Sequence, residues 1–192
     1  MTTTHAVATA PVTTAVPAAR YELDPAHTRA SFAVRHMMVA TVQNHFNNLT
    51  GTVVLDDAHP EASRVEATID ASTVNTGVEM RDNHLRSADF FDVAKYPQIT
   101  FRSKAVRVTG PDSFAVTGDL TIRDITRQVV LDVESAAFEV KDPYGNVKRG
   151  ATATTTINRK DFGLTWNQSL EAGGVLVGET VKITLDLELN RK

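Results

Sequence analysis

Five ionisable side chains fall within nine positions near the middle of this 192-residue chain: Arg81, Asp82, His84, Arg86 and Asp89. A carboxylate and an imidazole two residues apart could exchange a proton with a substrate, so Asp82 and His84 are candidates for a general acid and base. The same composition is typical of a salt-bridged surface helix that closes one end of a sheet. The cluster therefore predicts either the entrance of a binding site or a structural plug.

The segment that carries these groups differs from its surroundings. Residues 79–86 are good helix formers and do not alternate as a strand would, so they predict one short helix. Tyr96-Pro97 follows, and a residue before proline avoids the helical region. We therefore expect an extended segment to begin after Pro97.

Other chemistry is excluded by missing motifs. The sequence has no G-x-S-x-G elbow, no phosphate-binding glycine loop and no H-E-x-x-H pair. It has no cysteine, and its six histidines lack a close metal-ligand spacing. We therefore expect no catalytic residue, no metal and no cofactor. The net charge of −3 gives no support to nucleic-acid binding.

Nearly all of the chain after residue 20 alternates as strands separated by turns. Eight strands are predicted, near residues 30–38, 42–55, 64–71, 98–108, 113–122, 127–140, 149–158 and 178–190. An antiparallel sandwich and a closed barrel both satisfy this pattern. Small residues on the inward faces would leave volume unfilled and favour a hollow barrel: Ala67, Ala71, Gly118, Ala151 and Ala153.

Residues 1–20 have a different composition, nearly all Thr, Ala, Val and Pro. They lack the basic start and unbroken apolar core of a secretory signal, so we expect a disordered tail that contributes nothing to folding. Residues 21–192 would then form a single barrel domain. No stretch approaches the length of a transmembrane helix, so we expect no stable membrane insertion and a cytoplasmic location.

Several short motifs follow one another over residues 21–190. They are Tyr21-Glu22-Leu23-Asp24-Pro25-Ala26-His27-Thr28, Phe32-x-Val34-x-His36, Phe46 through Gly51, Arg81-Asp82-x-His84-Leu85-Arg86, Phe90-Phe91-Asp92, Tyr96-Pro97, Ile99-x-Phe101, Gly118-Asp119-Leu120-Thr121-Ile122, Arg159-x-Asp161-Phe162-Gly163-Leu164 and Gly178-Glu179-x-Val181. In these residues the chain resembles the YceI-like family of lipocalin-like, polyisoprenoid-binding proteins. Thr28 stands where serine is common, and the signal peptide of many relatives is not found here.

The resemblance implies an all-β fold, an eight-stranded antiparallel lipocalin-like barrel with one short helix. It also implies non-catalytic binding or carriage of a long-chain isoprenoid or another amphiphilic lipid, such as a quinone or a fatty-acid-like ligand. The candidates for the barrel lining are Phe32, Val34, Met38, Val65, Ile69, Phe114, Val116, Leu120, Val129, Leu131, Val181, Ile183 and Leu185. The candidates for contact with a headgroup are His36, Arg81, Asp82, His84 and Arg86.

Two other functions stay open at this point. One is an enzyme that acts on a prenyl or quinone substrate, with Asp82 and His84 as acid and base. The other is a structural or stress-response module whose barrel is filled by its own side chains. The sequence also leaves open whether the chain forms a homodimer.

Overall fold

The computed structural model describes residues 18–136, 138–171 and 173–192. One α-helix and twelve strands make up the described fold, along with three short 3₁₀ turns. The elements are β1 (Ala19–Leu23), β2 (Arg29–His36), β3 (Ala40–Phe46), β4 (Leu49–Leu55), β5 (Arg64–Asp70), β6 (Val74–Asn75), α1 (Glu79–Arg86), β7 (Gln98–Gly110), β8 (Ser113–Ile122), β9 (Ile125–Ser135), β10 (Val140–Lys141), β11 (Val147–Asn158) and β12 (Val177–Arg191).

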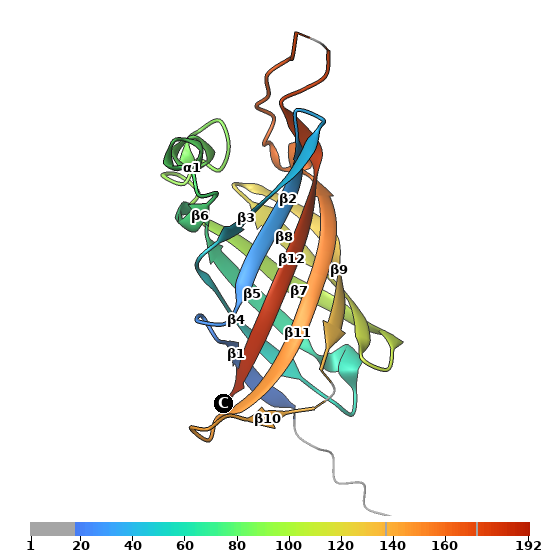
Figure 1. The fold of residues 1–192 in the computed structure, drawn as a ribbon. Helices are drawn as coiled ribbons and strands as arrows, with labels where there is room; N and C mark the ends of the chain where they lie inside the picture. The colour runs from blue at the N-terminus through green and yellow to red at the C-terminus, as the bar shows by residue number, and fades with distance from the viewer. Residues whose placement is uncertain (1–17, 137, 172) are drawn as a thin grey trace, which may run out of the picture.

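The strands close into a ring in which sequence neighbours lie side by side (Figure 1). β1 and β2 both pair with β12, so together they act as one bent strand. β3 and β4 pair with β2 and β1, and β5 and β6 pair with β4 and β3. β7, β8, β9 and β11 follow, and β11 returns to β12. The predicted eight-stranded antiparallel barrel is therefore confirmed, and the sandwich is excluded.

Three predicted strands differ from those observed. The predicted strand at 127–140 ends at Ser135, and Val140 lies in the separate strand β10. The predicted strand at 42–55 is two strands, because the chain leaves the ladder at Asn47 and Asn48. The predicted strand at 30–38 ends at His36, because Met37 and Met38 adopt positive φ angles of 50° and 63° in a tight turn. Met38 is 55% exposed. The prediction that Met38 continues the inward row of this strand was therefore wrong.

The first strand begins earlier than the predicted domain boundary. Ala19 pairs with Leu55 and Arg20 pairs with Val54, so both belong to the sheet. The carbonyl of Arg20 also accepts a hydrogen bond of 2.9 Å from the amide of Lys192. The predicted tail was therefore too long at its end, and the part of that prediction at residues 1–17 lies outside the described residues.

The inward-facing side chains follow the alternation of each strand except where β7 is irregular. Ile99, Phe101 and Ser103 are buried, and a register shift after Ser103 then moves the buried position to Val106. The Ser103 hydroxyl accepts a hydrogen bond of 2.8 Å from the amide of Val65 on β5. This side chain thus supplies a partner for a backbone group beside the shift.

Not all of the small inward residues leave empty space. A Cβ on Gly118 would collide with the Phe101 ring and with the Arg102 carbonyl. The ring therefore already fills the room that glycine provides, and the expectation of free volume at Gly118 was wrong. Ala67, Ala151 and Ala153 do line open space, whereas Ala71 is 1% exposed and packs into the core.

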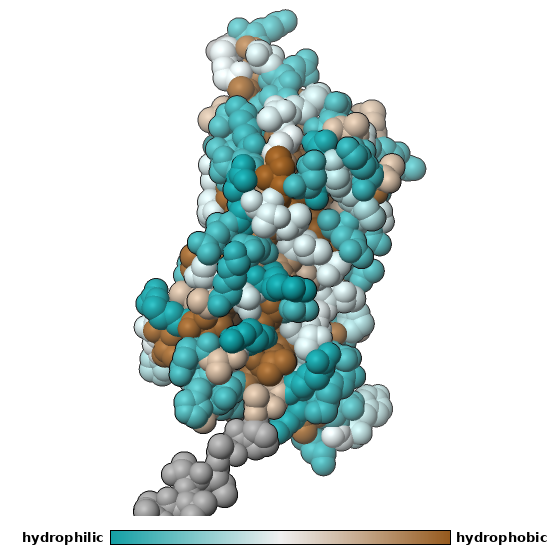
Figure 2. All heavy atoms as spheres, turned by 180° about the vertical axis from the view of Figure 1, so that it is seen from behind, coloured by the Kyte–Doolittle hydropathy of each residue, from teal (hydrophilic) through white to brown (hydrophobic). Residues whose placement is uncertain are grey.

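On the face shown in Figure 2, hydrophilic residues cover most of the surface, and hydrophobic residues gather toward its lower end. The exposed large hydrophobic residues on strands include Val108 of β7 and Val130 of β9. In the described part of the chain, no helix combines the length and apolar character that crossing a bilayer requires.

An ion-pair cluster fastens the turn between β1 and β2 to the strands beside it. Lys148 Nζ lies 2.8 Å from Asp24 Oδ2 and 2.6 Å from Glu188 Oε1. His27 Nδ1 lies 3.2 Å from the same Asp24 oxygen. The hydrogen bonds from Lys148, the Ala26 amide and His27 hold the pKa of Asp24 well below its ordinary value. We therefore interpret this cluster as structural, because the Lys148 ammonium group occupies the space between the carboxylates of Asp24 and Glu188.

Candidate functional site: a cavity inside the barrel

The barrel encloses a cavity of about 270 Å³. Every bent or single strand of the ring contributes side chains to its wall, and so does the segment that begins in α1. Pockets that hold small ligands usually measure about 300–1,000 Å³, so the volume of this cavity lies just below that range. Its wall is almost wholly apolar, which suits a hydrocarbon chain better than a polar metabolite.

Twelve of the thirteen lining residues predicted from the sequence lie on this wall. The predicted residues that the structure places there are Phe32, Val34, Val65, Ile69, Phe114, Val116, Leu120, Val129, Leu131, Val181, Ile183 and Leu185. They face inward because side chains on a strand alternate between its two faces. Their contact with a ligand stays a prediction.

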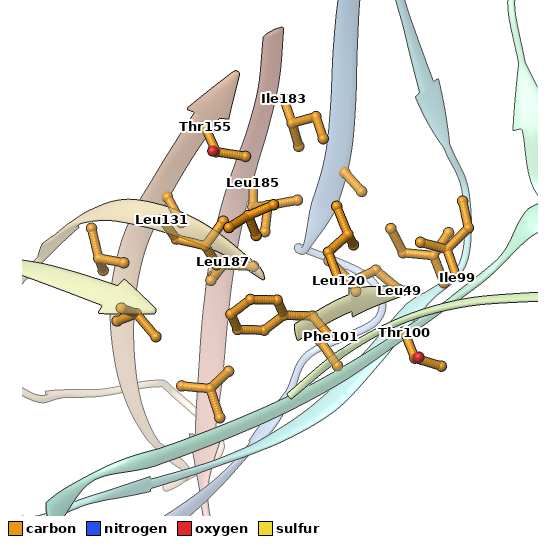
Figure 3. A pocket seen from close by; sticks show the side chains of 18 of the residues that line it. Leu49, Ile99, Thr100, Phe101, Leu120, Leu131, Thr155, Ile183, Leu185 and Leu187 are labelled. Atoms are coloured by element: carbon orange, nitrogen blue, oxygen red, sulfur yellow. The ribbon is translucent and has the colours of Figure 1, made fainter. Parts of the chain in front are cut away.

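A close view shows how side chains from distant strands meet across the lumen (Figure 3). Phe101 of β7 and Leu120 of β8 point toward Leu131 of β9 and toward Leu185 and Leu187 of β12. A chain lying among them would lose its contact with water along its length. Burial of this kind contributes roughly 0.8 kcal/mol for each CH₂ group.

One end of the cavity is formed by α1 and the loop that follows it. Leu85, Phe90 and Phe91 line the wall there. The Phe91 ring meets Phe46 at 5.5 Å between centroids, and Phe46 meets Phe32 at 5.4 Å. The segment at 79–93 thus supplies apolar lining to the cavity. The sequence offered the Phe90-Phe91 pair only as part of a family motif and gave no reason to place it inward.

Three charged residues of α1 form hydrogen bonds with groups of the segment at 72–76, which precedes the helix. Asp82 is 8% exposed and accepts hydrogen bonds from the Thr76 amide at 2.8 Å and the Thr76 hydroxyl at 2.5 Å. Arg81 donates to the Thr76 hydroxyl at 2.8 Å and to the Thr76 carbonyl at 2.9 Å. Arg86 donates to the carbonyls of Ser72 at 2.7 Å and Val74 at 2.9 Å. These bonds tie α1 to the segment that precedes it.

The two histidines predicted near a headgroup also lie away from the wall. His84 Nε2 is 3.0 Å from Asp89 Oδ2, and the ring packs edge-on against Trp166 with centroids 4.6 Å apart. His36 is the last residue of β2 and pairs with Val177. Of the described residues that line the cavity, none is among the five predicted for a headgroup: His36, Arg81, Asp82, His84 and Arg86. Their role in ligand binding stays a prediction.

The proposed acid and base do not face one another. Asp82 bonds to Thr76, and His84 bonds to Asp89. General acid–base catalysis needs each group within hydrogen-bond reach of a shared substrate. The geometry of this pair therefore favours structural roles for both residues.

Two arginines on the wall were missed by the sequence analysis. Arg159 is 4% exposed and lies near the α1 end, where its guanidinium donates to the carbonyls of Leu164, Trp166, Val177 and Gly178. Burial lowers the pKa of Arg159 from its ordinary value. The bonds draw the loop after β11 toward the start of β12.

Arg149 lines the cavity at the other end of β11. Its side chain is 10% exposed, and its Nη1 lies 2.9 Å from Asp57 Oδ1. Its Nε donates to the Ala136 carbonyl at 2.9 Å. A signal for this residue was present, because Arg149 shares its parity with Ala151 and Ala153 and is thus a cation in an inward row.

The chain is similar to known proteins over nearly its whole described length. Residues 21–189 match the family described as the YceI-like domain. A UPF0312 protein of Staphylococcus aureus (strain N315) is 36% identical over 170 residues, which cover 88% of this chain and 96% of that protein.

Solved structures show the same fold. The crystal structure of Burkholderia cenocepacia BcnA superposes with a TM-score of 0.76 at 24% identity, covering 86% of this chain and 98% of that one. The Campylobacter jejuni YCEI protein gives a TM-score of 0.68 at 29% identity, covering 82% and 90%. A polyisoprenoid binding domain from Saccharophagus degradans gives 0.64 at 16% identity, covering 90% and 98%.

Proposed function

The chain belongs to the family of YceI-like domains, and we propose that it binds a long-chain isoprenoid or another amphiphilic lipid in the barrel lumen without chemical turnover. The observation that carries this proposal is the apolar cavity that is lined by strands on all sides of the ring. A structural neighbour described as a polyisoprenoid binding domain supports the same class of ligand.

The affinity of such a site would come mainly from burial of the chain. Ten methylene groups contribute roughly 8 kcal/mol before the costs of association are subtracted. Open space among Ala67, Ala151 and Ala153 favours this function over a barrel filled by its own side chains. The cytoplasmic location, the absence of a cofactor and the oligomeric state stay predictions.

The binding proposal is preferred to an enzyme because of where the candidate acid and base lie. Asp82 and His84 have separate protein partners and are not on the cavity wall. The YceI-like fold is also that of a binding protein in the polyisoprenoid binding domain named above. We therefore propose that a bound chain is carried and released unchanged.

Native mass spectrometry of the purified protein tests the proposal. We expect a population heavier than the bare chain, and extraction should release a lipid with a long apolar portion. Leu131→Asp should abolish retention, because an unpaired carboxylate beside an apolar chain is costly. Val130→Asp is the matched control, because Val130 is the next residue on β9 and is 45% exposed on the outside.

A second variant separates loss of binding from loss of folding. Ala151→Leu adds apolar volume to the lumen without adding charge, so it should reduce lipid uptake while the barrel stays folded. Delipidated protein that takes up no long-chain lipid would overturn the proposal. Conversion of a prenyl substrate to product, lost in Asp82→Asn, would replace it with the enzyme alternative.

A further inference from the structure

The polar residues of the cavity wall are unevenly placed. Apart from Glu66, Arg159 and scattered hydroxyl groups, they gather where the β4–β5 connection meets the ends of β9 and β11, opposite α1 along the barrel (Figure 1). The members of this group are Asp56, Asp57, Ser63, Ser135 and Arg149. Only Arg149 among them carries a positive charge, so this end of the lumen has a cation facing hydrocarbon.

Arg149 is an inward cation whose partner lies outward. Its side chain is 10% exposed, whereas the side chain of Asp57 is 64% exposed. An ion pair with an exposed carboxylate contributes little, since water and salt compete for that carboxylate. Replacing Asp57 by another anion would therefore cost little, provided that the guanidinium keeps a partner.

The surroundings of Arg149 favour a ligand anion at this position. Its Nε is held by the Ala136 carbonyl at 2.9 Å, which fixes the plane of the guanidinium. The buried Tyr21 hydroxyl beside it donates to Glu139, so its oxygen can accept from Arg149. Asp56 is committed to its own turn, because Oδ1 accepts from the amides of Ala58 and His59. Asp57 is thus the anion that a ligand would displace.

The second wall arginine is not equivalent. Nε and both terminal nitrogens of Arg159 donate to backbone carbonyls of the chain. A ligand anion there would have to break bonds that hold the β11–β12 loop. The charged residues of α1 are likewise bound to the segment at 72–76.

We propose that Arg149 binds the anionic headgroup, a carboxylate or a phosphate, of a lipid whose hydrocarbon tail lies in the lumen. The inference rests on the proposed function and reverses the orientation expected from the sequence, because the headgroup lies away from α1. An arginine fork matches both anions, since two parallel N–H groups can meet two oxygens. Asp57 occupies the fork when no anionic ligand is present.

Ligands that share one hydrocarbon tail and differ only in their headgroup test this inference. A neutral fluorescent probe, N-phenyl-1-naphthylamine, is bound to the full chain and displaced by 1-hexadecanol, hexadecanoic acid or hexadecyl phosphate. We expect both anions to bind about tenfold more tightly than the alcohol, because charge-assisted hydrogen bonds are stronger than neutral ones. The acid and the phosphate arms then show which headgroup is preferred.

Variants of Arg149 and Asp57 test whether this ion pair causes the tighter binding of the anionic ligands. Arg149→Gln should remove the tenfold advantage of the anions while the affinity for the alcohol stays within about twofold. Asp57→Asn should increase the advantage about threefold, because the competing carboxylate is gone. Arg107→Gln is the control, since it removes the same charge from an exposed position on β7. If Arg149→Gln does not fold, Asp57→Asn and Arg149→Lys carry the test, with Lys retaining only part of the advantage.

The outcomes separate the two proposals. Equal binding of all three ligands by the natural chain, or an advantage that survives in Arg149→Gln, overturns the headgroup site and leaves the lumen function standing. Failure of the alcohol and of both anions to displace the probe overturns the lumen function, and the headgroup site with it.

Discussion

The two ends of this barrel carry charge in different ways. At the α1 end, Arg81, Asp82 and Arg86 lie close together in the sequence and bond to backbone and hydroxyl groups at residues 72–76. At the other end, Arg149 lies on the cavity wall with Asp56, Asp57, Ser63 and Ser135 and is paired with the exposed carboxylate of Asp57. The bonds of the dense cluster therefore favour structural roles for these residues, and Arg149 is the candidate that we propose for ligand contact.

The comparison shows why charge density in a sequence is a poor guide to a binding site. Charged residues that lie close in a helix find partners among neighbouring backbone groups, which satisfies them locally. A cation on an inward strand position has few such groups nearby, because ladder hydrogen bonds already use the backbone. Its partner must come from a loop or from a ligand, and here the loop supplies Asp57.

The largest expected difference between the ends concerns the two wall arginines. Arg159→Met should lower the free energy of unfolding by on the order of 3–5 kcal/mol, because several buried carbonyls lose a charged donor. Arg149→Met should cost only about 1–2 kcal/mol, since Asp57 can return to water. For a chain of this size each kcal/mol shifts Tm by about 2–4 °C. Thermal melts followed by circular dichroism measure both losses, and equal losses would contradict the comparison.

The fold was largely readable from the sequence because inward and outward positions alternate. The rows at Phe114–Ile122 and Val181–Leu189 showed which side chains face the lumen before any contact was known. The pattern could not reveal that three strands are broken in two, since the breaks preserve strand direction and depend on pairing partners. The positive φ angles at Met37 and Met38 also carried no sequence signal, because methionine does not favour that region.

The site was only half readable. Apolar lining follows from alternation, but the inward placement of Phe90 and Phe91 depends on how a loop packs, which periodicity does not describe. Free volume at Gly118 was misjudged, because a neighbouring strand supplies the Phe101 ring that fills it. The sequence also does not show that Thr76, Ser72 and Val74 face the charged residues of α1, and contact of those residues with a headgroup stays a prediction.

A smaller effect is expected from removing the carboxylate that ties α1 to its preceding turn. Asp82→Ala should lower the free energy of unfolding by about 1–3 kcal/mol, because the Thr76 amide and hydroxyl lose their shared acceptor. In Asp82→Ala, the rate of deuterium exchange should rise more at the backbone amides of α1 than at those of β8. The affinity of the lumen for 1-hexadecanol should change less than twofold. A large loss of that affinity with an intact helix would move the binding site to the α1 end.

Lys148, the neighbour of Arg149 on β11, is a cation that points away from the lumen, so its ion pair can be compared with that of Arg149. Asp24→Asn weakens the bond to Lys148 and should lower Tm by a few degrees at pH 7 without altering the preference for anionic ligands. The pKa of Asp24 is lowered in the folded chain, so its stabilisation is present above the ordinary value of 3.8 and is lost as pH falls below it. The difference in Tm between the natural chain and the variant should therefore narrow as the pH falls from about 4 to about 2. A difference that stays constant over this range would exclude Asp24 ionisation as its cause.

The smallest expected effect is that of His84→Ala, and it tests the α1 end as a headgroup site directly. His84 contacts Asp89, whose side chain is 53% exposed, and the edge of Trp166, so its loss should cost less than about 1 kcal/mol. Because His84 lies off the cavity wall, the ratio of affinities for hexadecanoic acid and 1-hexadecanol should be unchanged. Displacement of the neutral probe measures that ratio, with Arg149→Gln run beside it. A ratio that falls in His84→Ala and holds in Arg149→Gln would place the headgroup beside α1, as the sequence first suggested, and would reverse the orientation proposed for the chain.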